Sequence, residues 1–387
     1  MRVLLVTSRN PLPAWRGNQV RTVEWLEALG EHELALIYPE LDDVPQSSLS
    51  VDRFPYRLHV GSRAAGILLA AGGGRPLQEG LYESAEARKT VARAVNDWRP
   101  AVVVVQMVRC GWALDTILEV APQTPTIFDA IDSMGLHFES VARSAPVPMS
   151  VAYGREAARC RRRERELADA ATCTVAVSER DLVALAAPPN RRRAIPVAGR
   201  EIARSATSAT DPVILLSGNL GYRPTVRGAL WFAAEVWPRL RSLVPGVRWV
   251  LAGARPAAAV RRLDRSPGIE VHADVADLDP YLLKTRVAIA PMSSGSGVPM
   301  KVLEAMAAGV PTVVHPWAAE GLVKEACDAV VVASDAEEWV AALEPLLGNP
   351  GAAGEIGERG HLMWERFYHP ERVADQIREV VAEVATQ

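Results

Sequence analysis

Residues 287–315, VAIAPMSSGSGVPMKVLEAMAAGVPTVVH, contain one complete unit of strand, loop, helix and second strand. The aliphatic run Val287–Ala290 is typical of a buried strand, and a loop rich in serine and glycine follows it at Met292–Pro299. Strong helix formers at Met300–Ala308 predict a helix that ends at the next glycine, with a proline shortly beyond. A second strand is predicted at Thr312–His315. Strands joined through a helix are parallel, so this stretch predicts an α/β sheet.

The same alternation of short aliphatic runs and helical stretches extends along the whole chain. Val20–Leu29 and Ala85–Trp98 have the periodicity of amphipathic helices. The runs between helices are β-branched and almost continuously apolar, as in parallel strands that are covered on both faces. The predicted strands are Val3–Val6, Leu34–Tyr38, Ala101–Val105, Thr126–Phe128, Thr174–Val177, Val213–Leu216, Val247–Ala252, Ile269–Val271, Val287–Ala290, Thr312–His315 and Val330–Ala333.

The chain length and one break in this rhythm predict two domains. A chain of 387 residues is too long for one ordinary core, and residues 186–212 are rich in Pro, Gly, Ser and Thr without periodicity. We therefore expect two Rossmann-like, doubly wound parallel-sheet domains, at residues 1–200 and 201–369. The last helix, within 370–387, has one apolar stripe, and we expect it to pack back on the first domain.

Composition excludes several classes of protein. The chain is 49% hydrophobic and 23% charged, and its net charge of −3 gives no general attraction to nucleic acid. Its four cysteines are far apart, which predicts reduced thiols in the cytoplasm and neither a zinc site nor disulfides. The first apolar run, Val3–Val6, is too short for a signal peptide or a membrane span. GILLAAGGG, at 66–74, ends in glycines and predicts a mobile apolar loop.

The loop and helix at 292–308 have the features of an anion site. They bring free backbone amides and a helix N-terminus to the carboxyl edge of a parallel sheet, where phosphate groups bind favourably. Lys301 adds a positive charge in the first turn of this helix. Glu304, on the same face, would repel a phosphate but can accept two hydrogen bonds from a diol such as ribose. The residues thus fit a nucleotide, and they fit equally an exposed Lys–Glu pair after a flexible loop.

Several segments carry a resemblance to one family. GSGVPMKVLEAMAAGVPTVVHPWAAEGL, at 295–322, resembles the donor-site signature of family-4 glycosyltransferases of the GT-B fold. Residues 217–256 and 271–282 resemble the matching segments in the same order, and FDAIDSMGLHFESVAR at 128–143 is similar to the sugar-transferase branch. The resemblance covers nearly the whole chain. It implies two Rossmann-like domains that face a cleft, with the nucleotide-sugar donor held mainly by the second domain and the acceptor mainly by the first.

The resemblance also implies transfer with retention of anomeric configuration and without a metal. By position, Glu304 would hold the ribose hydroxyls and Lys301 the diphosphate. A lysine, a helix N-terminus and an arginine can together neutralise a diphosphate leaving group. Arg223 and Arg227 are the candidates for this arginine, and a plain surface helix is the alternative for both. The other implied donor-site residues are Gly218, Asn219, Asp274, Val275, Ser294, Gly295, Ser296, Gly297 and Val298.

The chain departs from the family pattern at two places. Many members have two glutamates separated by seven residues, but here Ser296 stands in the first position and only Glu304 remains. Many members also place a histidine in the first domain near the reacting sugar, whereas this segment contains Asp129 and Asp132. We expect Asp132 to be catalytic and Asp129 to contact the acceptor. His137 is a further acceptor candidate, with a purely structural histidine as the alternative.

The loop after the first strand is a further part of the expected site. Gly17 would allow the backbone to approach the donor diphosphate closely, and Arg16 and Asn18 would contact the acceptor. This assignment rests on the position of strand-to-helix loops at the edge of the sheet. A Pro-rich connection without function is the alternative.

The basic stretch REAARCRRRERELADA, at 155–170, has acidic residues interleaved with its arginines. This pattern predicts a solvated helix with salt bridges along its surface. Docking to a membrane surface near a lipid-linked acceptor is the alternative.

Taken together, these features predict a cytoplasmic, metal-independent glycosyltransferase that uses a nucleotide-diphosphate sugar. A nucleotide-sugar epimerase of the same architecture and a non-catalytic nucleotide-binding protein are the alternatives. A dinucleotide dehydrogenase is disfavoured, because no GxGxxG follows the first strand. The sugar, the base and the acceptor stay open, and the acceptor could be a polysaccharide precursor, a lipid carrier or a small natural product.

Overall fold

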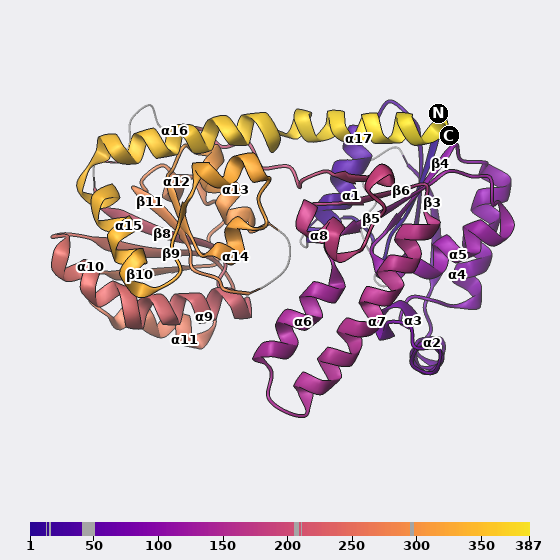
Figure 1. Ribbon diagram of the computed structural model, residues 1–387, viewed down its shortest axis with the longest axis horizontal. Coiled ribbons are helices and arrows are strands. Elements are labelled where there is room, and N and C mark those ends of the chain that lie inside the picture. The colour runs from indigo at the N-terminus through magenta and orange to yellow at the C-terminus, as the bar shows by residue number, and fades with distance from the viewer. Residues whose placement is uncertain (13, 15–16, 41–50, 205–208, 210, 295–297) are drawn as a thin grey trace. The chain divides into compact units, whose positions relative to one another are not determined.

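The chain forms two compact α/β units (Figure 1). The first consists of Met1–Val197 together with Val373–Gln387, and the second of Ala198–Arg372. Each unit has its own parallel sheet, so the predicted fold class of two doubly wound parallel-sheet domains is confirmed. The computed structural model describes residues 1–12, 14, 17–40, 51–204, 209, 211–294 and 298–387.

Within the described residues, the first unit has a seven-stranded sheet in the order β3-β2-β1-β4-β5-β6-β7. The chain runs outward in both directions from β1 and β4, which is a doubly wound order. The inner strands are the aliphatic runs that the sequence predicts. The outermost strands, β3 and β7, are not among the predictions, because DRFPYR and RRA are charged, as edge strands often are. The strands are β1 (Arg2–Val6), β2 (Glu33–Glu40), β3 (Asp52–Arg57), β4 (Val102–Gln106), β5 (Thr126–Ile131), β6 (Cys173–Ala176) and β7 (Arg192–Ala194).

The helices of the first unit include the two that the sequence predicts near Val20–Leu29 and Ala85–Trp98. The second of these ends in one π-helical turn, Ala94–Trp98. The described helices are α1 (Gly17–Ala28), α2 (Val60–Gly72), α3 (Leu77–Gly80), α4 (Ala85–Arg93), α5 (Gly111–Val120), α6 (Met134–Ser144), α7 (Met149–Ala170), α8 (Glu179–Ala184) and most of α17 (Pro370–Ala385).

The prediction of an apolar loop at 66–74 is wrong, since most of these residues belong to α2. Glycine here serves a close contact between helices. A Cβ atom built on Gly66 would lie 2.1 Å from the carbonyl oxygen of Gly80, so only glycine lets α2 and α3 approach this closely. A sequence pattern cannot separate this use of glycine from a loop.

The C-terminal helix α17 contributes to the core of the first unit from Val373 onward. The apolar stripe that the sequence predicts is buried. Arg378 donates a hydrogen bond to the carbonyl oxygen of Ala28 over 3.3 Å, and Arg193 pairs with Glu383 over 2.8 Å. Contacts of this kind fix the helix against α1 and β7. The buried stripe consists of Val373, Ile377, Val380, Val381 and Val384.

The second unit has a six-stranded parallel sheet in the order β10-β9-β8-β11-β12-β13 among the described residues. Alternate residues of β8 point into two separate cores, Leu215 into the one that contains α13 and Leu216 into the one that contains α9. Helices therefore cover both faces of the sheet. Trp237 lies in the second core, and Trp231 packs against it. The strands are β8 (Val213–Asn219), β9 (Arg248–Ala254), β10 (Ile269–Ala273), β11 (Val287–Ala290), β12 (Thr312–Val314) and β13 (Val331–Val332), and the described helices are α9 (Arg223–Trp231), α10 (Trp237–Leu243), α11 (Ala258–Arg261), α12 (Asp279–Leu282), α13 (Met300–Ala307), α14 (Pro316–Ala319), α15 (Ala336–Gly348) and α16 (Pro350–Phe367).

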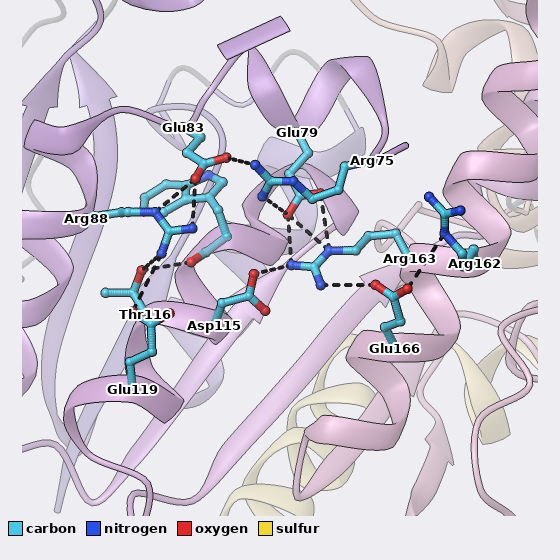
Figure 2. Close-up of polar contacts among 11 residues, drawn as sticks. Arg75, Glu79, Glu83, Arg88, Asp115, Thr116, Glu119, Arg162, Arg163 and Glu166 are labelled. Atoms are coloured by element: carbon cyan, nitrogen blue, oxygen red, sulfur yellow. Dashed lines mark hydrogen bonds and ion pairs between the residues drawn. The ribbon is translucent and has the colours of Figure 1, made fainter. Parts of the chain in front are cut away.

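A network of ion pairs fixes α7 within the first unit (Figure 2). Arg163 turns inward from α7 and pairs with the fully buried Glu79 of α3 over 3.0 Å and with Asp115 of α5 over 2.6 Å. Arg162 and Glu166 lie one turn apart on the exposed side. The prediction of a salt-bridged helix at 155–170 is therefore confirmed for that side, and the buried pair with Glu79 adds a tertiary contact that the sequence pattern does not reveal.

Two further observations bear on the expectations from composition. In the part of the chain that the structure describes, no helix has both the length and the apolar character needed to cross a bilayer. All four cysteines are free thiols, and Cys327 alone among them is partly exposed.

Candidate functional site

The candidate site in the second unit lies where the order of the strands reverses. β8 and β11 are neighbours, but the strands that follow them in sequence lie on opposite sides. The loop after β8 leads to α9 on one face, and the loop after β11 leads to α13 on the other. In open α/β sheets the divergence of two such loops opens a crevice at the carboxyl edge, where ligands bind.

Lys301 lies at this edge of the sheet, in the first turn of α13. Its Nζ atom is 3.4 Å from the hydroxyl of Thr225 on α9 and 3.7 Å from the sulfur of Met292. Burial lowers the pKa of Lys301 to about 8, and the negative charge of Glu304 acts in the opposite direction. No carboxylate of the described residues pairs with this ammonium group. A partly desolvated cation without a counter-ion is prepared to bind an anion.

The backbone at the end of β8 lies directly beside this lysine. Gly218 has φ +100°, and a Cβ atom built on it would lie 3.6 Å from Cε of Lys301. Its neighbour in the sheet is Gly253, where a Cβ atom would lie only 1.8 Å from the carbonyl oxygen of Gly218. Glycine at position 253 therefore lets the ends of β8 and β9 approach closely, and glycine at position 218 adopts its positive φ without strain beside the ammonium group.

Glu304 lies one turn after Lys301 and is partly buried. Its carboxylate accepts no hydrogen bond from the described residues. Burial raises the pKa of Glu304, whereas the positive charges of Arg200 and Lys301 lower it. Arg200 is itself held by Asp279 over 2.5 Å. Arg200 and Thr225 are not among the predicted site residues, because Arg200 lies in the aperiodic segment 186–212 and Thr225 is an ordinary helix residue.

Three more of the predicted donor-site residues, Asn219, Asp274 and Val275, lie at or just after the ends of β8 and β10. Asp274 has φ +52°, and its carboxylate accepts a hydrogen bond from the amide of Arg255 over 2.6 Å. The side chain of Asn219 accepts a hydrogen bond from the amide of Gly221 over 3.0 Å. Asn219 thus shapes its own loop, and Asp274 joins its loop to the loop after β9. Val275 packs partly buried against the core that contains α13.

The remaining predicted donor residues are distributed around the start of α13 and α9. Val298 packs against the α13 core, and Ser294 is partly buried. Arg223, the first residue of α9, and Arg227, one turn later, are both exposed. Neither forms an ion pair with another of the described residues. Thr225 of the same turn contacts Lys301, so Arg223 begins the helix that borders the lysine. The predicted residues Arg16, Gly295, Ser296 and Gly297 lie outside the described residues.

The predicted residues of the first unit lie at the corresponding edge of its sheet. Met107 directly follows β4 and has φ +66°, and Ile131 is the last residue of β5 and has φ +64°. Backbone in this conformation costs about 1–3 kcal/mol for a residue other than glycine, and such strain concentrates at functional sites. Asp132 follows Ile131 directly and is partly buried. It lies at the carboxyl edge, as the prediction of a catalytic role requires.

His137 lies one turn into α6, within the electrostatic influence of Asp132. Burial lowers the pKa of His137, Asp132 raises it and Arg109 lowers it. Its Nδ1 atom is buried and has no hydrogen-bond partner among the described residues. A structural histidine usually has such a partner, so this observation favours the predicted contact with a ligand.

Asp129 has a different environment. It is fully buried, with Oδ2 at 3.4 Å from Arg21 Nε and at 3.0 Å from the side-chain nitrogen of Gln106. Arg21 also donates hydrogen bonds to the carbonyl oxygens of Ile195 and Pro196. These contacts join α1 to β5 and to the segment at residues 195–196. The acceptor role of Asp129 stays a prediction, and the observed contacts are structural.

The two remaining predicted residues open α1. Gly17 is exposed, and a Cβ atom built on it would have no neighbour within 4 Å. The hydroxyl of Thr22 lies 2.9 Å from the carbonyl oxygen of Asn18 and 2.6 Å from Oε1 of Gln106, and it can donate its one proton to either. Nothing in the structure therefore requires glycine at position 17. The start of α1 is joined through Thr22 to the edge formed by β4 and β5.

The described parts of the chain contain no obvious set of metal ligands. No group of three or more His, Cys, Asp or Glu residues there is arranged to hold a metal ion. The requirement for a metal is untested by this observation, so metal independence stays a prediction.

Comparisons with known proteins agree with this architecture. Residues 211–349 match the family model described as glycosyl transferases group 1. No curated protein sequence matches the chain. Among solved structures, sucrose-phosphate synthase from Thermosynechococcus elongatus is similar with a TM-score of 0.70 and 14% identity, over 100% of this chain and 99% of that one.

Two other solved structures are similar over comparable lengths. A UDP-forming α,α-trehalose-phosphate synthase from Burkholderia xenovorans has a TM-score of 0.66 and 12% identity, over 100% of both chains. Anabaena HepE in complex with UDP-glucose has a TM-score of 0.61 and 11% identity, over 99% of this chain and 100% of that one. At these identities the likeness is one of fold. Residues 211–349 therefore match a group 1 glycosyl transferase domain, and the chain has the GT-B fold of these solved structures.

Proposed function

We propose that this protein is a metal-independent, retaining glycosyltransferase that moves a sugar from a nucleotide-diphosphate sugar to an acceptor hydroxyl. The observation that carries the proposal is the pair of charges on α13. Lys301 and Glu304 lie one turn apart and partly desolvated, and neither is bonded to an opposite charge of the described residues. A ligand with a diphosphate and a ribose supplies a partner for both groups.

The proposed donor chemistry uses positive charge from the chain itself. As the bond between the sugar and the diphosphate breaks, negative charge develops on the leaving oxygen. Lys301, the amide groups at the start of α13 and the exposed Arg223 would neutralise this charge. Because these groups belong to the protein, the proposal needs no metal ion.

The donor base is best sought first among uridine nucleotides. UDP or UDP-glucose is bound by the structurally similar HepE, and a similar trehalose-phosphate synthase is described as UDP-forming. These descriptions support a UDP-sugar as the first donor to test. Retention is proposed from the resemblance of residues 295–322, and the anomeric configuration of the product, measured by NMR, tests it.

The first unit is proposed to bind the acceptor. Asp132 lies at the carboxyl edge of its sheet and would accept the proton of the acceptor hydroxyl as the new bond forms. His137 and Asn18 would contact the acceptor. We propose a sugar, a lipid-linked sugar or a small natural product as acceptor, in the cytoplasm. Contact of the arginine-rich α7 with a membrane surface would accompany the lipid-linked case.

A screen for nucleotide binding tests the central step. UDP, GDP, ADP and dTDP are each added in a thermal-shift experiment, since a ligand that binds the native state alone raises its melting temperature. We expect one of them, UDP first, to stabilise the protein. Glu304→Gln should weaken donor binding or turnover by about tenfold or more, equivalent to about 1.4 kcal/mol.

The same samples separate transfer from the alternatives. The preferred nucleotide sugar is incubated alone and with a panel of acceptors, in the presence of excess chelator. Glycosylated product that requires the acceptor and persists in chelator supports the proposal. Conversion of the donor alone to an epimer, loss of activity that magnesium restores, or unchanged kinetics in a folded Glu304→Gln variant would each contradict a part of it.

A further inference from the structure

The turn that carries Asp132 is held more tightly than the start of a helix requires. Ile131, at φ +64°, shifts the register between β5 and β6, and its carbonyl oxygen accepts a hydrogen bond from the amide of Val177. Asp132 follows, and Ser133 then caps α6 through a hydrogen bond from the amide of Leu136 to its hydroxyl. A serine cap alone is an ordinary and sufficient way to begin a helix.

A buried glutamate from α7 adds several hydrogen bonds to this turn. Glu164, only 1% exposed, accepts from the amide of Met134 over 2.6 Å, from the hydroxyl of Ser133 over 3.0 Å and from the amide of Gly135 over 3.3 Å. A Cβ atom built on Gly135 would lie 3.1 Å from a carboxylate oxygen of Glu164. Glycine at this position therefore makes room for the carboxylate.

A second buried acid holds the same turn from another element. Asp181, in the first turn of α8, accepts a hydrogen bond from the amide of Ser133 over 3.1 Å. Its other carboxylate oxygen accepts from the hydroxyl of Ser178, the N-cap of that helix. The amides of residues 133–136 thus all have acceptors, and acids from α7 and α8 supply three of them. Asp132 lies between this fixed segment and the strained Ile131.

The position of Glu164 is itself fixed, because the preceding residue anchors α7 in the ion-pair network of Figure 2. Arg163 is held there by Glu79 and Asp115. Burial raises the pKa of Glu164 to about 7, the three donors lower it, and the charge of Asp132 raises it. Asp132 and Glu164 therefore influence each other electrostatically as well as through the backbone.

We propose that Glu164, together with Asp181, is a positioning residue for Asp132. The two buried acids hold the backbone of residues 133–135, and this fixes Asp132 at the sheet edge against the strain of Ile131. Glu164 does not touch the substrate. This inference rests on the proposed function, because it assigns to Asp132 the acceptor chemistry described above.

The first test compares two buried glutamates of α7. Glu164→Gln keeps the size of the side chain but replaces one of the two accepting oxygens with an amide donor, so that the three donors around it share a single oxygen. We expect kcat to fall about tenfold or more, with KM for the donor within about twofold, because the donor site lies in the second unit. Glu156→Gln is the matched control: Glu156 is also buried and accepts from the amide of Leu77, at the start of α3. Its kcat should stay within about twofold of wild type.

The second test asks whether Glu164 acts through Asp132. If it does, adding Glu164→Gln to Asp132→Asn should change kcat by less than about twofold beyond Asp132→Asn alone. If instead the two substitutions lower kcat independently, so that the double variant shows the product of the two single reductions, the inference is overturned. Hydrogen exchange gives a readout that does not depend on activity, and we expect the amides of Met134 and Gly135 to exchange about tenfold faster in Glu164→Gln. If that variant does not fold, Ser133→Ala removes one donor to Glu164 and should lower kcat in the same way.

The outcomes separate this inference from the proposed function. Transfer by the wild-type protein with an unchanged kcat in folded Glu164→Gln overturns the positioning role alone. A wild-type protein that transfers sugar from no donor in the panel overturns the proposed function and this role with it. A fall in kcat and faster exchange in Glu164→Gln, both absent in Glu156→Gln, support the inference.

Discussion

The carboxyl edges of the two sheets differ in whether their buried charged side chains have bonding partners. In the second unit, Lys301 and Glu304 are partly desolvated, and no opposite charge of the described residues is bonded to them. In the first unit, Glu164 and Asp181 are more deeply buried, and backbone and hydroxyl donors surround them. A charge without a partner marks where a ligand is to bind, whereas a fully bonded charge marks what holds the backbone.

The backbones of the two edges differ in the same sense. Beside Lys301 the second unit uses Gly218 and Gly253, where φ is positive and the strands approach closely. Farther from the lysine, Arg255 and Asp274 after β9 and β10 also have positive φ. The first unit places Met107 and Ile131 in positive φ, where a side chain adds strain. Glycine adopts such a backbone conformation without strain. A strained edge needs support from elsewhere in the fold, and the buried acids supply it at Ile131.

The largest expected effect comes from removing the unpaired charge. Lys301→Met should lower kcat/KM by about 100-fold or more, because one positive group at a developing charge contributes that much. The same change should leave the melting temperature unchanged or raise it, since a desolvated ammonium without a counter-ion is replaced by an apolar side chain. Kinetics and a thermal melt of the nucleotide-free protein measure the two effects.

Lys301→Arg serves as the control, because it keeps the charge with a different shape. A Lys301→Met protein that melts many degrees lower than wild type would mean that the ammonium is a structural group. The contrast between the two edges would then no longer hold.

The next effect concerns pH: as pH rises, the affinity for nucleotide should fall while the stability of the nucleotide-free protein should increase. Burial lowers the pKa of Lys301 from 10.5 to about 8 in the free protein. Above that pH the ammonium loses its proton, so the affinity for a nucleoside diphosphate should fall by up to about tenfold per pH unit. Between about 8 and 10.5 the unfolded chain binds more protons than the folded one, so the nucleotide-free protein should gain stability from this group as pH rises.

Calorimetric titration of nucleotide at several pH values, with denaturant melts of the free protein alongside, measures both trends. In Lys301→Met neither trend should be present from this group. A nucleotide affinity that stays constant from pH 7 to 10 in the wild-type protein would show that Lys301 does not carry the charge that binds the diphosphate.

The sequence predicts the second edge far better than the first, for a physical reason. Lys301 and Glu304 follow from one local strand–loop–helix pattern, in which spacing along a helix fixes which side chains share a face. Glu164 meets Ser133 from 31 residues away, and Arg21 meets Asp129 from 108 residues away. No local periodicity encodes such pairs, so the buried acids appear in the sequence only as part of a charged helix.

The same distinction applies to the fold. The inner strands of both sheets are predictable because an aliphatic run has few other places to lie. The edge strands β3 and β7 carry charge and belong to the sheet through pairing with β2 and β6. The helix α2 contains the glycine that packs on Gly80, and that contact is a property of the tertiary structure.

The smallest expected effect tests the strain of the first edge. At an ordinary position glycine is less stable than alanine by about 0.5–1 kcal/mol. At Ile131, with φ +64°, the order should reverse, so that Ile131→Gly is more stable than Ile131→Ala by about 1 kcal/mol. Both variants lose nearly the same buried side chain, so the difference between them reports the backbone conformation. Urea denaturation with a common m-value measures it.

The outcome also bears on the two buried acids. If they hold the turn in its strained form, combining Ile131→Gly with Glu164→Gln should destabilise the protein less than the sum of the single changes, because less strain then remains to be held. Alanine as stable as glycine at this position would mean that the turn is not strained in solution. The buried acids would then be explained by the cap of α6 alone, and the difference between the two edges would reduce to the pairing of their charges.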